Sequence, residues 1–395
     1  MFSNNFATIG SGDGKRRMIY ADYTSSTPVL PEVMQEMLPY FDELYANPSS
    51  LNDFALKARR AVEEARERVA NLLGASAEEI IFTSGGAEAN NLAIKGFIHA
   101  NRARGKHVVV SAVEHYSVMH PLQSLAREGV QVTRVGVDEH GRVRVEELER
   151  AIREDTILIS VQHANHEVGS LQPIREVAEI AEERGIALHC DGVSSAGVVP
   201  AKVEELGVDM YTLSAHRFYG PKGVGALYLA RGTRLLPLIE GGIQERGYRA
   251  GTENVPGIVG MGKAAELAER EMRSRLEKLR RLRQRFLAEF QEEVPDAKIN
   301  GHRSEVNPMY AHISVAGVEG ETVVAELSAR GVHITSGSPC MARAAKASHV
   351  LAAMGLSAEL IRGAVLFSLG VPMSEADVVR LAQEAGEVIR RLRGE

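Results

Sequence analysis

Short apolar segments that alternate with helical ones place the strongest constraint on the fold of this chain. They are EIIFT (79–83), HVVVSA (107–112), TILISVQ (156–162), IALHC (186–190), MYTLSA (210–215) and GALYLA (225–230). Continuous runs of Val, Ile and Leu are typical of strands buried on both faces, and intervening helices cover such a mostly parallel sheet. The sequence therefore predicts an α/β fold built around a parallel sheet.

Polar clusters stand at the carboxyl ends of the predicted strands. They read SGG, EH, HAN, CDG and SAHR and begin at residues 84, 114, 163, 190 and 214. In open α/β sheets, ligands bind in a crevice beyond these strand ends. We therefore expect the five clusters to face one binding site.

Three of these clusters indicate particular chemistry. SGGAEANN (84–91) follows a strand and opens a helix, so its free amides and the helix dipole favour a phosphate group. The same turn is also typical of a plain helix cap. Asp191 ends an apolar strand, where its carboxylate suits a protonated ring nitrogen. His115 suits a base or a flat stacking partner, and equally a structural histidine.

A helix is predicted over residues 52–74, ahead of the first strand. Its apolar residues recur at three- and four-residue spacing, and the pattern stops at Gly74. Such spacing with a terminal glycine is typical of an amphipathic helix and its left-handed cap.

The pattern changes at about residue 262, where a long charged helix begins and is followed by short strands and closing helices. We place a domain boundary near 257–262. The division gives a large cofactor-type α/β domain over 18–260. A smaller α+β domain covers 261–395 and also takes the N-terminal segment 1–17.

Composition excludes several classes of function. The net charge of -6 argues against a nucleic-acid surface, which needs clustered Lys and Arg. No apolar run is long enough to cross a bilayer, and the start of the chain lacks the apolar stretch of a signal peptide, so we expect a cytoplasmic protein. Cys190 and Cys340 lie far apart without metal-ligand spacing, which indicates neither a disulfide framework nor a zinc site. Cys190 ends an apolar strand and is expected to be buried.

Motifs along the chain strongly resemble those of one family. They include YADYTSSTPVLPEV, IIFTSGGAEANNLAIKG, SAVEHYSV, VQHANHEVGSLQPI, LHCDGVSSAG, SAHRFYGPKGVGALY, RAGTENVPGIVG and SGSPCMARAAKASHVLAAMGL. In this order they resemble the NifS/IscS cysteine desulfurases of the class V aminotransferase group. The resemblance covers the chain from about residue 18 to its C-terminus.

The resemblance implies a fold type I enzyme with a seven-stranded sheet in its large domain. Such an enzyme uses pyridoxal phosphate to take sulfur from cysteine, leaving alanine and a persulfide. Cys340 matches the persulfide-forming cysteine, and a homodimer is implied in which Thr252 reaches the phosphate in the other subunit. The cofactor contacts implied in this way are Gly86, Ala87, His115, Asn165, Asp191, Ser194, Ser214, His216, Arg217 and Thr252.

Five of these positions have specific roles in the resemblance. His115 would stack on the pyridine ring, Asp191 would pair with the ring nitrogen, and Asn165 would hydrogen-bond the ring hydroxyl. Ser214 and His216 would hold the phosphate. His115 and Cys340 are therefore the expected catalytic residues.

Several site positions depart from the family pattern. Arg217 stands where the family has the lysine that forms a Schiff base with the coenzyme. Leu366 replaces the arginine that grips the substrate carboxylate, and Ala87 replaces a phosphate-binding threonine. Ser194 replaces a glutamine, and His166 replaces a second asparagine. Departures at several positions favour a naturally divergent site, similar to archaeal members that lack the lysine, over an engineered single change.

Arg217 changes what the site can do. A guanidinium with a pKa above about 12 has no free amine lone pair near neutral pH and cannot form the Schiff base. Pyridoxal phosphate would then be held without a covalent bond, and Arg217 would be free to pair with its phosphate. Lys222 in the adjacent GPKG turn belongs to the family motif and is expected to be structural.

Three hypotheses follow from the resemblance and its departures. The first is an impaired or unusual cysteine desulfurase acting on L-cysteine, with Cys340 as the sulfur acceptor. The second is a non-catalytic homodimeric scaffold whose Cys340 carries sulfur or ligates an iron-sulfur cluster. One cysteine per subunit would then need ligands from a partner such as an IscU-type scaffold protein. The third is a pyridoxal phosphate enzyme for a substrate without a carboxylate, which would explain Leu366.

Overall fold

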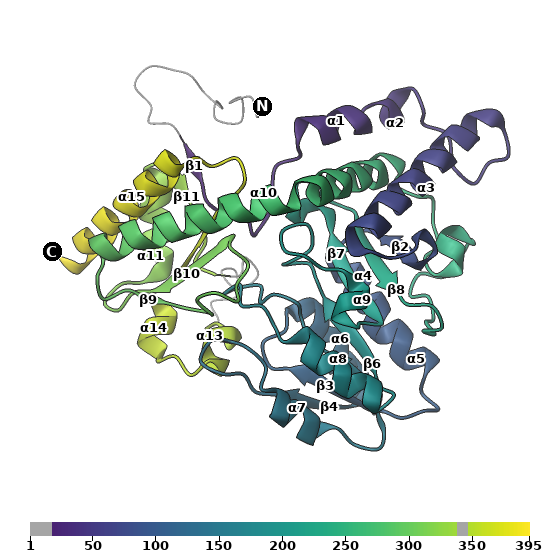
Figure 1. Cartoon of the computed structure of the whole chain (residues 1–395), viewed down its shortest axis with the longest axis horizontal. Helices are drawn as coiled ribbons and strands as arrows, with labels where there is room; N and C mark the ends of the chain where they lie inside the picture. Colours follow the sequence, from purple (N-terminus) through teal and green to yellow (C-terminus); the bar gives the residue numbers. More distant parts are fainter. Residues whose placement is uncertain (1–17, 338–346) are drawn as a thin grey trace.

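A seven-stranded sheet forms the centre of the molecule in the computed structural model, which describes residues 18–337 and 347–395 (Figure 1). Its strands lie in the order β2-β8-β7-β6-β5-β3-β4. They are β2 (Ile80–Thr83), β3 (His107–Ser111), β4 (Gln131–Val135), β5 (Thr156–Ser160), β6 (Ala187–Asp191), β7 (Met210–Ser214) and β8 (Gly225–Leu229). Strands β3 to β7 are parallel, and β8 runs antiparallel to both β7 and β2. The predicted mostly parallel sheet is confirmed.

One strand of this sheet, β4, was not predicted from the apolar segments of the sequence. Strand β4 lies at the edge of the sheet, next to β3 alone, and its residues QVTRV are mostly exposed or half-exposed. An edge strand has only one neighbour and one covered face, so it needs no continuous apolar run.

Helices cover the sheet and connect its strands. They are α3 (Asp53–Leu73), α4 (Gly86–Asn91), α5 (Phe97–Ala100), α6 (Tyr116–Arg127), α7 (Val145–Ala151), α8 (Ile174–Glu183) and α9 (Val203–Leu206), with α1 (Pro31–Met37) and α2 (Pro39–Asp42) before them. The predicted helix over 52–74 is α3. Asn52 caps it by accepting a hydrogen bond from the Ala55 amide at 2.9 Å, and Gly74 ends it with a left-handed φ of 66°.

A second lobe contains a three-stranded antiparallel sheet in the order β12-β10-β9 and a two-stranded parallel pair, β1 and β11. The strands are β1 (Ile19–Tyr20), β9 (Lys298–Ile299), β10 (Tyr310–Ser314), β11 (Val332–His333) and β12 (Ala364–Ser368). Their helices are α11 (Gly320–Ala329), α13 (His349–Ala353), α14 (Ala358–Arg362) and α15 (Glu375–Arg393). The start of the described chain therefore pairs with a strand more than three hundred residues later.

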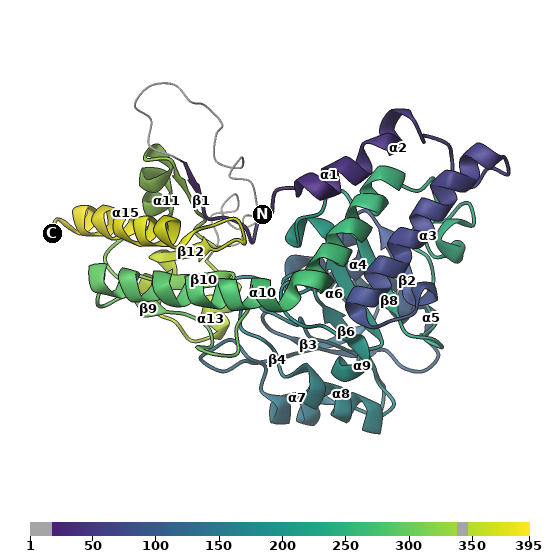
Figure 2. The same ribbon diagram turned by 45° about the horizontal axis from the view of Figure 1, so that its top comes forward.

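The 39-residue helix α10 (Val255–Glu293) links the two lobes. It packs against α1 and α3 at one end and against α15 at the other, as Figures 1 and 2 show. The helix begins earlier than the predicted position near 262, because Asn254 accepts a hydrogen bond from the Gly257 amide and caps it. The division into domains near 257–262 stays a proposal, since α10 runs unbroken through that stretch.

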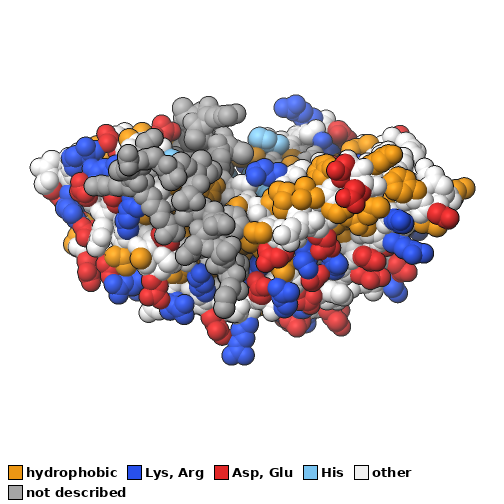
Figure 3. Space-filling view, turned by 90° about the horizontal axis from the view of Figure 1, so that it is seen from above, with side chains coloured by type: hydrophobic (Ala, Val, Ile, Leu, Met, Phe, Trp, Pro, Cys, Tyr) orange, Lys and Arg blue, Asp and Glu red, His pale blue; other side chains and the backbone are white. Residues whose placement is uncertain are grey.

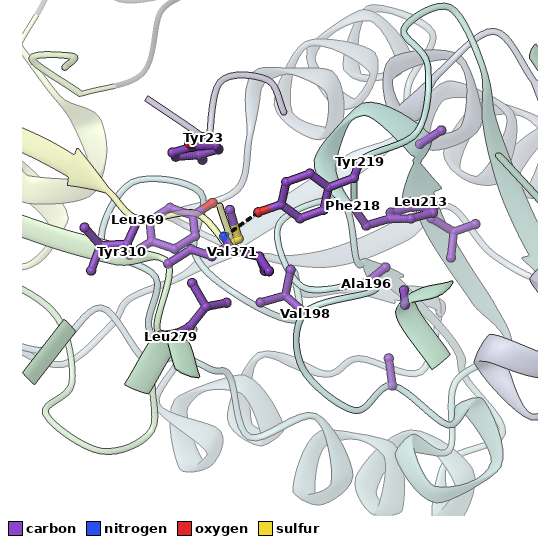
Figure 4. Packing of buried hydrophobic residues seen from close by; sticks show 14 of the residues in the cluster. Tyr23, Ala196, Val198, Leu213, Phe218, Tyr219, Leu279, Tyr310, Leu369 and Val371 are labelled. Atoms are coloured by element: carbon purple, nitrogen blue, oxygen red, sulfur yellow. Dashed lines mark hydrogen bonds between the residues drawn. The ribbon is translucent and has the colours of Figure 1, made fainter. Parts of the chain in front are cut away.

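Buried side chains join the lobes beside the carboxyl end of β7 (Figure 4). Phe218 and Tyr219 pack in one core with Tyr310, Leu369 and Val371 of the second lobe. The Val371 amide donates a hydrogen bond of 2.7 Å to the Tyr219 hydroxyl. Tyr219 has a φ of 71°, which is unusual for a residue with a side chain and persists where neighbours hold it. The turn after β7 is thus fixed by contacts with the second lobe.

The sequence predicts no helix that crosses a membrane. None of the described helices is both long enough and apolar enough to span one.

Candidate active site

A cavity of about 300 Å³ lies at the carboxyl ends of β3, β5, β6 and β7. Most of the predicted site residues line it, namely Gly86, Ala87, His115, Asp191, Ser194, Ser214, His216 and Arg217. The four clusters at 84, 114, 190 and 214 therefore do face one crevice, and the HAN cluster contributes Ala164. The cavity is near the lower end of the range for ligand pockets, roughly 300–1,000 Å³.

A larger hollow of about 980 Å³ opens elsewhere, between residues such as Ala187, Asp209 and Arg231. It lies at the amino ends of β6 and β7 and is lined by none of the predicted site residues. Volume alone does not mark a site, because specificity needs convergent polar groups. The smaller cavity meets that condition.

Asp191 and His115 belong to one hydrogen-bonded network. Asp191 is 5% exposed, and its carboxylate accepts hydrogen bonds of 2.8 Å from the Asn90 side-chain amide and 2.9 Å from the Val193 backbone amide. Asn90 also donates to the Ser117 hydroxyl at 2.8 Å. The Ser117 backbone amide donates to His115 Nδ1 at 3.1 Å, so this nitrogen accepts and the neutral ring carries its proton on Nε2. Burial lowers the pKa of His115, which keeps the ring neutral.

Strand β7 delivers Ser214 and His216 to the opposite part of the cavity. The strand ends at Ser214 and continues into a single 3-10 turn, Ala215–Arg217. The His216 carbonyl accepts hydrogen bonds of 2.9 Å from both the amide and the hydroxyl of Thr27, which hold the turn in place. Burial lowers the pKa of His216 to about 4, and its Nδ1 is buried without a hydrogen-bond partner in the described part of the chain.

Arg217 is half-buried and lines the same cavity. Its Nε is buried without a partner, and it has no ion pair with a carboxylate in residues 18–337 or 347–395. Burial raises the pKa of Tyr310, whereas the charge of Arg217 and hydrogen bonds with Ser194 and Arg217 lower it. The guanidinium therefore lies near the Tyr310 phenol, and it also acts on Asp22: burial raises the pKa of Asp22, whereas a hydrogen bond with Ser25 and the charge of Arg217 lower it.

No lysine is among the described residues that line this cavity. Lys222 is exposed and lies outside the cavity. Burial is the main cause of the low pKa of His216, and the charges of Arg217 and Lys222 lower it further. The described side chains thus offer no amine for a Schiff base inside the cavity.

Three predicted site residues do not line the cavity. Asn165 is fully buried, and its side-chain carbonyl accepts hydrogen bonds of 2.9 Å from the backbone amides of Glu167 and Val168. Thr252 lines a separate hollow of about 120 Å³, and its expected contact with the phosphate in another subunit is not tested by a single chain. Cys340 lies outside the described residues. The roles given to these three residues stay predictions.

Sequence reasoning named no role for several residues that do line the cavity. Thr24 and Ser25 arrive from the segment after β1, and Gln162 follows β5. The TSS sequence at 24–26 was noted only as part of a motif. Its position depends on pairing with the distant β12, since the Thr24 amide donates a 3.0 Å hydrogen bond to the Ser368 hydroxyl.

A group of buried titratable residues stands next to the cavity. His166 lines the cavity and meets the His115 ring edge-on, with centroids 5.1 Å apart. Its Nε2 lies 3.7 Å from the Glu167 carboxylate, and both atoms lack a hydrogen-bond partner. Burial raises the pKa of Glu167 to about 7 and that of Glu114 to about 8.

Cys190 is fully buried as predicted, and burial raises its pKa.

Comparisons with known proteins agree with this geometry. The family model for aminotransferase class-V matches residues 19–381. The cysteine desulfurase IscS of Dictyoglomus turgidum is 45% identical over 378 residues, which is 96% of each chain. A solved NifS-like protein superposes with a TM-score of 0.89 at 34% identity, covering 95% of this chain and 100% of that one. The solved complex of SspA with cysteine gives a TM-score of 0.76 at 34% identity, with coverages of 89% and 98%.

The matches extend over both lobes and include the cavity between them. A family model that covers most of the chain, together with relatives above 40% identity, identifies the family on sequence, and the solved structures give the same fold. The chain belongs to the class V aminotransferases, among the cysteine desulfurases of the NifS/IscS type.

Proposed function

We propose that this protein binds pyridoxal phosphate without a covalent bond and acts in sulfur mobilisation and iron-sulfur cluster assembly. Its desulfurase chemistry on L-cysteine is slowed, and Cys340 is its sulfur-accepting or cluster-ligating residue. The observation that carries the proposal is the cavity itself, which has an arginine and no lysine among its described lining residues. The name of the 45% identical relative, a cysteine desulfurase, supports the substrate.

The described cavity fits pyridoxal phosphate as a non-covalent ligand. His216 Nδ1 and Arg217 Nε are buried polar atoms without partners among the described residues, and the Arg217 Nε donor is suited to an anionic ligand. Asp191 offers a carboxylate for a protonated ring nitrogen, and His115 offers a flat neutral ring. When bound there, the coenzyme supplies an electron sink for carbanion stabilisation.

The protein's own residues would divide the remaining work. Ser214 and His216 would hold the phosphate at the end of β7, while Asp191 and His115 would orient the ring. The neutral His115 carries its proton on Nε2, so it can donate one hydrogen bond toward the cavity. The missing amine removes the proton carrier that the family lysine provides. Because positioned acid-base groups contribute roughly a hundred- to ten-thousand-fold in rate, we expect a loss of that size.

A homodimer is part of the proposal, and an exposed apolar surface supports it. Large hydrophobic side chains on α1, α2 and the segment after them are unusually exposed, with Met34 at 42%, Leu38 at 54%, Phe41 at 61% and Tyr45 at 69%. Figure 3 shows orange side chains gathered on one half of the face that carries α1 and α2. Contiguous exposed apolar surface marks an interaction site, and a second copy would cover it. Sedimentation of the wild-type protein beside Phe41→Asp tests this.

A second candidate is the non-catalytic scaffold, which carries sulfur or shares a cluster with an IscU-type partner. Arg217 favours it, because its guanidinium cannot replace a lysine amine. Thiolate ligation of a cluster through one cysteine per subunit would need further ligands from that partner. If this candidate is correct, the protein binds the partner and the cluster but forms no alanine from cysteine.

One experiment separates the two candidates. Purified protein is mixed with pyridoxal phosphate and L-cysteine, and alanine and sulfide are measured for the wild type, Arg217→Lys and Cys340→Ala. Alanine formation by the wild type that rises at least tenfold in Arg217→Lys supports the slowed enzyme. If the wild type and Arg217→Lys both form none, while Cys340→Ala abolishes cluster transfer to a scaffold protein, the scaffold candidate replaces it.

A further inference from the structure

Arg217 is the one Lys or Arg among the described residues that line the cavity. The other charged side chain among the described lining residues is Asp191, whose carboxylate is already engaged by Asn90 and by the Val193 amide. The histidines in the lining have pKa values lowered by burial and are neutral at pH 7. A ligand that enters the cavity therefore meets the Arg217 guanidinium, whose charge also acts on the Asp22 carboxyl.

The Tyr310 side chain of the second lobe lies near this guanidinium. Tyr310 is on β10 and is fully buried, it borders a small hollow together with Arg217, and the charge of Arg217 lowers its pKa against the effect of burial. In the register of the antiparallel pair, Tyr310 is opposite Ser368 on β12. Paired residues project from the same face of a sheet, and so do residues two apart along a strand. Leu366 therefore projects from the same face as Tyr310, and it lines the same cavity as Arg217.

The cavity thus has a cation, Arg217, and an apolar side chain, Leu366, in the same lining as Ser214 and His216. Arg217 also borders a narrow hollow with Thr24, Ser194 and Tyr310, away from Gly86 and Ala87. Its unpartnered Nε and an adjacent Nη form the edge of the guanidinium that takes a carboxylate through two parallel hydrogen bonds. Leu366 is 2% exposed and cannot donate a hydrogen bond, which leaves Arg217 as the cation available to an anion among the described lining residues.

We propose that Arg217 is the receptor for the carboxylate of an α-amino acid ligand, with Leu366 as the apolar surface beside it. This inference deepens the proposed function and rests on it only for the identity of the ligand as cysteine. It makes Arg217 a specificity-determining residue and assigns the cavity to substrates that carry a carboxylate. The positive charge that lines the cavity then serves recognition and not covalent anchoring.

Binding of L-alanine to the full-length protein tests the proposal, because alanine has the carboxylate and amine but no sulfur to lose. Dissociation constants are measured calorimetrically with and without saturating pyridoxal phosphate, for L-alanine and for L-alaninamide, which lacks the carboxylate. The variants are Arg217→Gln, Arg217→Lys and the control Lys222→Gln, which removes a nearby exposed cation outside the cavity. Circular dichroism melting verifies that each variant is folded.

Arg217→Gln is expected to raise the dissociation constant of L-alanine about 10- to 100-fold, the scale for losing charge-assisted hydrogen bonds. The dissociation constant of L-alaninamide should change by less than about twofold. Without pyridoxal phosphate, Arg217→Lys should lie between it and the wild type, because an ammonium keeps the charge and loses the fork. Lys222→Gln should match the wild type. The proposal is overturned if Arg217→Gln weakens the binding of both ligands equally, or if it does not weaken the binding of L-alanine.

The phosphate of the coenzyme is the other anion that Arg217 can meet. If Arg217→Gln weakens pyridoxal phosphate more than tenfold but leaves L-alanine binding unchanged at saturating coenzyme, Arg217 is a phosphate receptor and the proposal fails. The outcome is independent of catalysis. A protein that binds L-alanine through Arg217 but forms no alanine from cysteine refutes the slowed desulfurase and leaves this inference standing.

Discussion

Removal of Arg66 should destabilise the protein strongly, because it would leave a buried carboxylate without its cation. Arg66 on α3 makes two hydrogen bonds of 2.7 and 2.8 Å with Glu245, and their side chains are 4% and 3% exposed. Glu245 also accepts a 2.8 Å hydrogen bond from the Phe82 amide on β2. The pair fastens the segment around Glu245 to the large lobe, and both Glu245 and Thr252 border the same hollow.

The size of the effect follows from this burial. Removing one partner of a buried ion pair costs about 3–5 kcal/mol, whereas exposed pairs contribute about 0–1 kcal/mol. We therefore expect Arg66→Met to lose about 3–5 kcal/mol of unfolding free energy. The control is Arg175→Met, whose partner Glu179 is one turn away on α8 and whose pair is 57% exposed on each side. It should change stability by less than about 1 kcal/mol.

Urea unfolding followed by circular dichroism at pH 7 measures both variants. A second change distinguishes lost charge from lost packing: Glu245→Gln in the Arg66→Met background keeps an acceptor for the Phe82 amide and removes the stranded charge. The double variant should be more stable than Arg66→Met. The reasoning is refuted if Arg66→Met is no less stable than Arg175→Met, or if the second change lowers stability further.

Three other predictions concern the site and its supports. Arg217→Lys should gain a visible absorbance band with pyridoxal phosphate that borohydride abolishes, while Lys222→Arg should leave the wild-type spectrum unchanged. Burial raises the pKa of Glu114 to about 8, well above the ordinary range of a glutamate, so the folded state holds its proton more tightly and stability should fall as pH rises from about 5 through 8. The melting temperature of Glu114→Gln should show less of this fall. Tyr219→Phe removes the acceptor of the buried Val371 amide and should cost about 1–3 kcal/mol in urea unfolding, which Tyr45→Phe should not.

Local patterns in the sequence determined much of the large lobe. Continuous apolar runs predicted six of its strands, and the Gly74 stop marked the end of α3. These features depend on side-chain burial and backbone conformation within one element, so neighbouring residues suffice to read them. The same holds for His115 and Asp191, since polar residues at the carboxyl ends of parallel strands must meet at one edge.

Contacts between distant segments were decided only by the tertiary structure. The sequence identified Arg217 and Leu366 as departures, and it contained no sign that Tyr310 on β10 would lie near the guanidinium. Nor did it place Thr24 in the cavity, because that position follows from a hydrogen bond to Ser368. Strand register and the packing of one lobe on the other depend on burial shared by residues hundreds of positions apart. The amino-acid sequence thus determined which side chains replace the lysine and the arginine of the family pattern, and the fold decided which residues surround Arg217.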